Sequence, residues 1–222
     1  MYPETIDPGT KRVLDTLTNL RHGSGVAGVV PGFLDSFCLA GGTALAIELG
    51  HRRSIDLDFF SSEDFRPSDI RLVLSKAGEL VVVGEDAGTL HITFDGVKVS
   101  FLRYQYRMLF DAVGFEGVKL ADERDIAAMK IDAIASRGSR KDFVDLFVLL
   151  EKYTLQEILG FFEHKFEGIG FNTLHILKSL VFFEDAEGEP MPMMLRDISW
   201  EVVKKTIADA VMDFEREQEL NA

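Results

Sequence analysis

The residues Gly41-Gly42-Thr43 follow a short apolar run, 37–40, and precede a segment with helical character, 43–49. Glycines let the backbone turn sharply and approach a ligand closely. Free N–H groups at a helix N-terminus favour an anionic phosphate. The spacing matches neither the dinucleotide-binding fingerprint nor the P-loop, so the glycines alone are equally compatible with a plain strand-to-helix turn.

Two carboxylates, Asp56 and Asp58, follow in a segment that alternates like a strand, residues 55–60, which places both on one face. The opposite face is apolar: Ile55, Leu57 and Phe59. Clustered carboxylates repel unless a cation compensates them, and Mg²⁺ or Mn²⁺ prefers such oxygen ligands. The alternative is that Arg52 and Arg53 neutralise an exposed pair at the edge of the strand.

A second candidate group combines Lys130 with Asp142 and Asp145. Lys130 shares the apolar stripe of a predicted helix, so its amine must reach the surface, pair with an acid or line a polar cleft; reaching the surface is the commonest of these outcomes. Asp142 could simply favour the N-terminus of the next predicted helix. Asp145 lies in an otherwise apolar helix and therefore needs a charged or hydrogen-bonding partner.

The elements that must position these residues form an α+β pattern. Strand-like runs and helices alternate up to residue 117, and successive helices follow from residue 118. Predicted strands are 37–40, 55–60, 80–84, 89–94 and 97–104; predicted helices are 10–21, 43–49, 68–77 with Ser68 as cap, 122–136, 141–152, 155–165, 172–181 and 199–219. We therefore expect an α+β lobe, 1–117, and a helical lobe, 118–222, with a soft boundary that also permits one compact domain.

Composition limits the classes of function. No apolar segment approaches the roughly 20 residues needed to cross a membrane, and the N-terminus lacks a signal-peptide pattern, so we expect a cytoplasmic protein without membrane contact. The net charge of −13 opposes nonspecific binding to nucleic acid, so an RNA substrate would need a local basic patch. Candidates for it are Arg52, Arg53, Arg103, Arg107, Arg137, Arg140 and Lys141.

Together, the segments 39–46 and 50–60 resemble the AbiEii/AbiGii toxin-type branch of the polymerase-β-like nucleotidyltransferase superfamily. The resemblance implies a mixed sheet with flanking helices and a mainly helical C-terminal lobe. It also implies that the Gly-Gly turn holds nucleotide phosphates and that Asp56 and Asp58 bind catalytic metal. Residues 125–150 resemble later motifs of the same branch, which assigns the remaining roles to Lys130 and Asp142, with Asp145 orienting or structural.

The chain departs from this pattern at two positions. Lys141 stands where the family motif has an arginine. Ser100, on the predicted strand 97–104, stands where many relatives carry a third carboxylate. The resemblance covers about 37–150, and the sequence beyond Tyr153 shows no recognisable chemistry.

The leading hypothesis is a Mg²⁺-dependent toxin-like nucleotidyltransferase that moves NMP from an NTP to a hydroxyl on RNA or protein, with a cognate antitoxin as a further partner. In this hypothesis Asp56 and Asp58 bind the metal, Gly41, Gly42 and Thr43 bind phosphate, and Lys130 counters phosphate charge. Ser100 and the acidic surface favour a second hypothesis, a degenerate nucleotide-binding or protein-interaction module. A structural protein with an unrelated acidic strand is a third.

Overall fold

The computed structural model describes residues 1–21 and 32–220. Among these residues, seven strands form one mixed sheet in the order β3-β4-β5-β2-β1-β7-β6. β2 is parallel to β5 and β1 is parallel to β7, whereas the other neighbours are antiparallel. The strands are β1 (Cys38–Ala40), β2 (Leu57–Ser61), β3 (Leu80–Asp86), β4 (Thr89–Phe94), β5 (Val97–Arg103), β6 (Val113–Phe115) and β7 (Val118–Leu120).

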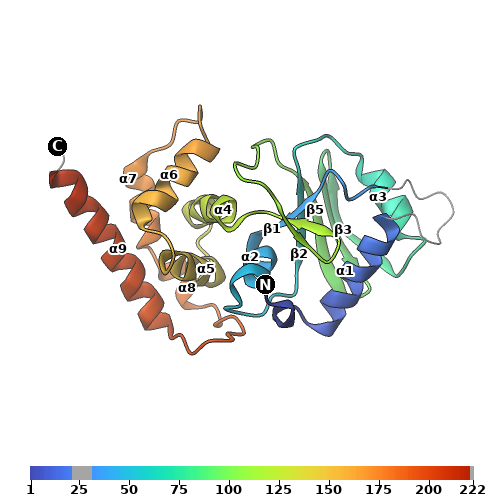
Figure 1. The fold of residues 1–222 in the computed structure, drawn as a ribbon, viewed down its shortest axis with the longest axis horizontal. Coiled ribbons are helices and arrows are strands. Elements are labelled where there is room, and N and C mark those ends of the chain that lie inside the picture. The colour runs from blue at the N-terminus through green and yellow to red at the C-terminus, as the bar shows by residue number, and fades with distance from the viewer. Residues whose placement is uncertain (22–31, 221–222) are drawn as a thin grey trace.

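The helices divide between the two ends of the molecule. In Figure 1, α4 to α9 gather at one end, the sheet with α1 and α3 lies at the other, and α2 lies between them. The helical elements are η1 (Pro3–Thr5), α1 (Pro8–Arg21), α2 (Gly41–Leu49), α3 (Pro67–Leu74), α4 (Glu123–Ser136), α5 (Arg140–Leu150), α6 (Leu155–Lys165), α7 (Thr173–Leu180), α8 (Glu184–Glu187) and α9 (Trp200–Leu220). This arrangement confirms the predicted α+β fold.

One face of the sheet is buried and the other is open. Alternate residues of β4 and β5 are buried, and α1 and α3 contact this part of the sheet. The residues between them, including Ser100 on β5 and His91 on β4, are half-buried or exposed. Because side chains alternate along a strand, Asp58 of β2 lies on this open face with them.

Several predicted boundaries differ from the structure. β2 begins at Leu57 rather than residue 55, and Ile55 is 58% exposed. Residues 54–55 instead bind the N-terminal segment. The amide of Ser54 donates a hydrogen bond to the carbonyl of Thr5, and the hydroxyl of Thr10 donates one to the carbonyl of Ile55. These contacts hold residues 54–55 outside the sheet, so Asp56 precedes β2 and only Asp58 of the predicted pair lies within the strand.

The starts of two helices also differ. α2 begins at Gly41, two residues earlier than predicted, so both glycines belong to its first turn. α3 begins at Pro67 with Arg66 as its N-cap, so the prediction of Ser68 as the cap is wrong; proline suits the first helical position, where its missing N–H costs nothing. The short elements β6, β7 and α8 were not predicted.

The stretch 23–32, which the sequence predicts to be a loop after the helix 10–21, falls largely outside the described residues. β7, which follows residue 117, pairs with β1 in the same sheet. The division into lobes at that residue stays a prediction. No helix in the described part of the chain is long and apolar enough to span a membrane.

Candidate active site

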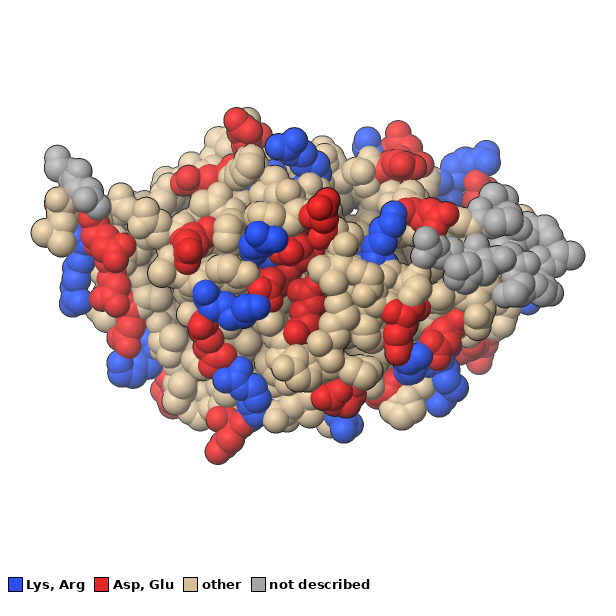
Figure 2. Space-filling view, viewed as in Figure 1, with Lys and Arg blue, Asp and Glu red and all other residues tan. Residues whose placement is uncertain are grey.

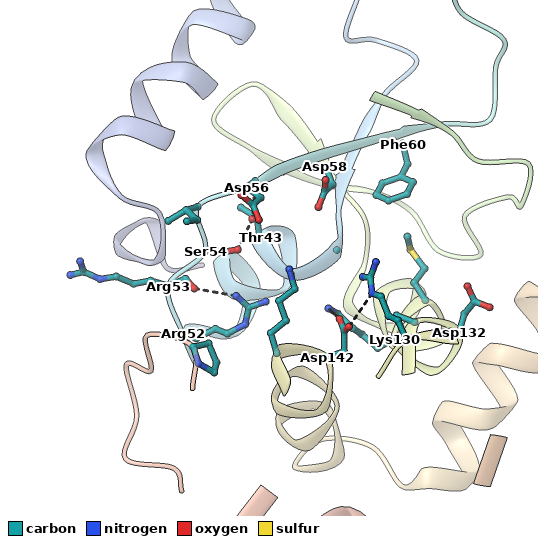
Figure 3. Close-up of a pocket in the computed structure, with 18 of the residues that line it drawn as sticks. Thr43, Arg52, Arg53, Ser54, Asp56, Asp58, Phe60, Lys130, Asp132 and Asp142 are labelled. Atoms are coloured by element: carbon teal, nitrogen blue, oxygen red, sulfur yellow. Dashed lines mark hydrogen bonds and ion pairs between the residues drawn. The ribbon is translucent and has the colours of Figure 1, made fainter. Parts of the chain in front are cut away.

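A cavity of about 490 Å³ lies between the edge of β2 and the helices α4 and α5. Figure 3 shows Asp56, Asp58 and Phe60 on the β2 side and Lys130, Asp132 and Asp142 on the helical side. All seven predicted site residues line it: Gly41, Gly42, Thr43, Asp56, Asp58, Lys130 and Asp142. The structure therefore brings together two sequence groups that are more than seventy residues apart.

Gly41 is the residue at which the glycine turn lies close to a carboxylate of the cavity. Its φ of +66° is a conformation that favours glycine. A Cβ built on Gly41 would lie 3.7 Å from Oδ2 of Asp58, so the turn and this carboxylate are in direct proximity. The N-cap residue of α2 is Ala40, which supplies no side-chain hydrogen bond, and the amides of the first turn are thus left for another acceptor.

Thr43 positions the segment that carries Asp56. The threonine is 3% exposed, and its Oγ1 lies 2.7 Å from Oγ of Ser54. The same hydroxyl is hydrogen-bonded to the carbonyl oxygen of Asp56. Thr43 therefore fixes the entry into β2, and its predicted contact with phosphate stays a prediction.

The side chains of Asp56 and Asp58 are half-buried and face the cavity. Among the described residues, neither carboxylate has a hydrogen bond or an ion pair. The alternative in which Arg52 and Arg53 neutralise the pair through ion pairs is not what the structure shows, because the guanidinium of Arg52 binds Asp145 instead. Two carboxylates that face a cavity without an ion-pair partner are a suitable donor set for a hard divalent cation.

Within the described ranges, no three His, Cys, Asp or Glu side chains meet as a group that could hold a metal ion. A cation at Asp56 and Asp58 would therefore need further ligands from water or from substrate phosphates, as Mg²⁺ commonly has. Ser100 is the register partner of Asp58 on the neighbouring parallel strand, so a residue without charge occupies the adjacent place.

Lys130 binds two carboxylates beneath the cavity. Its Nζ lies 2.8 Å from Oδ1 of Asp142 and 2.6 Å from Oδ2 of Asp145, with only 6% of the side chain exposed. Of the outcomes considered from sequence, the amine pairs with acids and lines the cavity rather than reaching the surface, because these partners compensate its burial. Burial alone would lower the pKa of Lys130, but the charges of Asp145 and Asp142 raise it above its ordinary value.

Asp145 is the centre of this buried group and is fully buried. Arg52 donates to both of its oxygens, from Nε at 2.6 Å and Nη2 at 2.9 Å, and Nε2 of His51 lies 2.8 Å from Oδ1. Burial by itself would raise the pKa of Asp145, but the charges of Arg52 and Lys130 outweigh it and hold the pKa well below its usual range. The partner that the sequence required is therefore chiefly Arg52, ninety-three residues away.

The carboxylate of Asp142 also has several hydrogen-bond and ion-pair partners. In addition to Lys130, it accepts a hydrogen bond of 2.6 Å from the hydroxyl of Ser139, and Nε of Arg137 lies 3.4 Å from Oδ2. Burial opposes ionisation, but Lys130 and these donors hold the pKa of Asp142 below its ordinary value. Its position in the first turn of α5 is favourable as well, and its role in the reaction stays a prediction.

The candidate basic residues separate into two sets. Arg52, Arg53, Arg137 and Lys141 line the cavity. Arg103, Arg107 and Arg140 do not: Arg103 pairs with Asp64, and Arg140 donates to the carbonyls of Ala186 and Glu187. Figure 2 shows Asp and Glu interspersed with Lys and Arg over the visible face of this molecule, whose net charge is −13.

Sequence reasoning missed one end of the cavity. This end is lined by Phe60, Tyr104, Met129 and Asp132, with the rings of Phe60 and Tyr104 edge to face at 5.4 Å. Burial raises the pKa of Asp132. The available signal was spacing, because Phe60 continues the alternation of Asp56 and Asp58.

The C-terminal tail also contributes, although no chemistry was expected beyond Tyr153. Pro192 and Met193 line the cavity. The amide of Arg53 donates to the carbonyl of Met193 at 2.7 Å, and an isolated bridge joins Arg52 to Met194. The tail therefore holds the segment that connects α2 to β2.

A glycine-rich helix start beside two carboxylates, in a mixed sheet followed by helices, defines a protein of nucleotidyltransferase fold. The profile of the family described as "Nucleotidyl transferase AbiEii toxin, Type IV TA system" matches residues 27–219. The chain therefore belongs to the AbiEii nucleotidyltransferase toxin family.

The chain is also similar to individual proteins in sequence or in fold. The uncharacterized protein aq_aa25 of Aquifex aeolicus (strain VF5) is 38% identical over 191 residues, which cover 82% of this chain and 90% of that protein. The fold is similar to MenT4, a nucleotidyltransferase toxin of Mycobacterium tuberculosis H37Rv, with a TM-score of 0.58, 15% identity and coverage of 92% and 83% of the two chains. It is also similar to JHP933 of Helicobacter pylori, with a TM-score of 0.53, 14% identity and coverage of 97% and 96%.

Proposed function

We propose that this protein transfers NMP from an NTP to a hydroxyl group on RNA or protein, with Mg²⁺ or Mn²⁺ as cofactor. The observation that carries the proposal is the proximity of Gly41 to Asp58, because a Cβ at position 41 would lie 3.7 Å from Oδ2 of this carboxylate. The same cavity also contains Lys130. A helix start suited to phosphate and free carboxylates suited to a divalent cation are then within reach of one triphosphate.

Each residue has a defined part in this proposal. Asp56 and Asp58 would hold the cation, which would neutralise phosphate charge as the bond to the leaving pyrophosphate breaks. The first amides of α2, at Gly41, Gly42 and Thr43, would bind phosphate oxygens. Arg53 and Lys141, both exposed at the cavity, would attract the triphosphate electrostatically.

Lys130 of α4 and Asp142 of α5 line the helical side of the cavity. The two acids that bind the ammonium of Lys130 keep it protonated and fix its position, so it would meet the phosphates as a preorganised N–H donor whose charge is already paired. The free cations at the rim then supply the stronger attraction for the triphosphate, because no carboxylate of the described chain neutralises Arg53 or Lys141 through an ion pair.

The partners follow from the same proposal. Family membership supports a cognate antitoxin, because the family is described as a type IV toxin–antitoxin system. An NTP substrate would place the protein in the cytoplasm.

The test is an assay with labelled NTPs, Mg²⁺, total RNA and bulk protein. We expect label in one acceptor fraction, and we expect Asp58→Asn to reduce the rate about 10³-fold, since the metal contributes several kcal/mol and each 1.36 kcal/mol is tenfold. Asp69→Asn, an exposed aspartate on α3, is the matched control and should retain the full rate. Transfer at the normal rate by Asp58→Asn would refute the metal-binding assignment.

A second candidate is a nucleotide-binding module without transferase activity. Ser100, the uncharged neighbour of Asp58, favours it because the site then has one carboxylate fewer. Binding of NTP without any transfer would support this candidate over the enzyme.

A further inference from the structure

A row of polar side chains crosses the open face of the sheet from Asp58. The register places Asp58 of β2 opposite Ser100 of β5, and Ser100 opposite His91 of β4. Register partners on adjacent strands point to the same face, so all three side chains share one face. Of the three, only Asp58 lines the cavity, and the row continues from it to Ser100 and His91.

Ser100 and His91 are in direct contact. Oγ of Ser100 lies 3.1 Å from Nδ1 of His91, and the histidine is exposed. On the far side of His91, its register partner on β3 is Gly84, next to an irregularity in the pairing after Val82. Because glycine has no side chain, the imidazole is left uncovered on that side.

The proposed reaction needs a group that accepts the proton of the attacking hydroxyl. A serine cannot hold that proton, but it can pass one on while it receives another. Histidine is the side chain that acts most often as a general base, because an imidazole nitrogen without a proton can accept one.

We propose that Ser100 and His91 form the proton-accepting pair for the acceptor hydroxyl, in place of the missing carboxylate; this inference rests on the proposed nucleotidyl transfer. The acceptor oxygen forms a bond to the α-phosphorus as the bond from that phosphorus to the β-phosphate oxygen breaks and pyrophosphate leaves. The hydroxyl proton passes to Oγ of Ser100 as the serine proton passes to Nδ1 of His91. His91 ends the step as imidazolium and later releases the proton to solvent.

The charged groups around His91 permit this role. On the same face, Lys98 of β5 is the register partner of Thr93, and Asp86 of β3 is the register partner of Thr89. Thr93 and Thr89 lie two positions after and two positions before His91 on β4. A cation, Lys98, and an anion, Asp86, therefore lie on opposite sides of the imidazole. Asp58 lies two strands away and is occupied by metal in the proposed state.

If the pair had only a structural role, its loss would change only the stability of the fold. That change in melting temperature should be small, because both residues lie on an open face. A catalytic role instead predicts a change in kcat and in its dependence on pH.

The experiment measures NMP transfer between pH 5.5 and 9, to whichever acceptor the labelling assay identifies. It compares the unaltered protein with His91→Gln and Ser100→Ala. We expect each variant to lose roughly 10²-fold in kcat, the scale of general-base catalysis, with KM for NTP unchanged and the acidic limb of the pH profile flattened. Thr93→Val, on the same face of β4, is the matched control and should retain both rate and profile.

Replacement of the pair by a carboxylate provides a second variant. Ser100→Asp combined with His91→Gln should recover at least about tenfold of the lost rate and should remain active at lower pH. Full rate and an unchanged profile in His91→Gln would overturn the inference while the proposed function stands. NTP binding without transfer by the unaltered protein would overturn both.

Discussion

The chain contains two pairs of aspartates that differ in their surroundings. Asp56 and Asp58, on the cavity side of β2, have no ion-pair partner among the described residues, whereas Asp142 and Asp145 on α5 are bound by Lys130, Arg52 and further donors. A charge without a partner remains available to a ligand, and a saturated charge contributes to the architecture. The residue type alone therefore does not define a role; the presence of partners does.

The strongest test of this difference is an aspartate-to-asparagine substitution in each pair, compared by its effect on stability. Asp145→Asn should destabilise the protein by about 3–5 kcal/mol, because it leaves Arg52 and Lys130 buried with less compensation. At roughly 2–4 °C per kcal/mol for this size, the melting temperature should fall by about 6–20 °C. Asp58→Asn should change it by less than about 2 °C. Equal losses in the two variants, measured by thermal or urea unfolding, would remove the distinction.

The free pair should also respond to ligand. With two aspartates as its protein ligands, Mg²⁺ should bind well only together with NTP. At a hundredfold excess over the dissociation constant, the ligands should stabilise the protein by about 2.7 kcal/mol, or roughly 5–11 °C. The measurement is a thermal-shift matrix of metal against nucleotide.

Two variants sharpen this measurement. Asp56→Asn should abolish the joint effect, and Ser100→Asp should increase the shift produced by metal alone. A large shift with Mg²⁺ alone in the unaltered protein would contradict the argument that a ligand is missing beside Asp58.

Glu48 belongs to neither pair, and its effect should depend on pH. Its Oε1 is buried without a hydrogen-bond partner in the described structure, and burial, with smaller contributions from Glu123 and Asp122, raises the pKa of Glu48 to about 8. The folded state therefore binds this proton more tightly than the unfolded state. Its stabilising contribution is complete below about pH 4.5 and is lost as pH rises through about 8.

Glu48→Gln should consequently match the unaltered protein at pH 5 and exceed it at pH 9 in the midpoint of urea unfolding. Glu63→Gln, an exposed control, should leave the difference between the two pH values unchanged. A variant that gains no advantage at pH 9 would show that Glu48 finds compensation in solution.

The sequence predicted much of the cavity because its groups are local. Asp56 and Asp58 are two residues apart and the glycines are adjacent, so alternation and turn chemistry made them candidates, and the family resemblance joined them into one site. The approach of Lys130 to the same cavity followed from the family resemblance. The assigned roles of these residues in catalysis stay predictions until the variants are measured.

What the sequence did not reveal depends on distant contacts. The pairing of Arg52 with Asp145 joins residues ninety-three apart, and local pattern carries no information about it. Ile55 was misplaced because the N-terminal segment binds residues 54–55 and removes them from the strand. Met193 reached the cavity through a backbone hydrogen bond, which leaves no signature in side-chain types.

The packing of Arg52 against Gly42 has a consequence for how this sequence can vary. A Cβ at position 42 would lie 2.1 Å from Nη2 of Arg52, well inside any tolerable contact. The guanidinium cannot retreat easily, because Asp145 holds it through two hydrogen bonds. Positions 42 and 52 are therefore a mutationally coupled pair: alanine at 42 should become acceptable only after a shorter residue replaces the arginine, so during divergence the second glycine can be lost only after Arg52 has been.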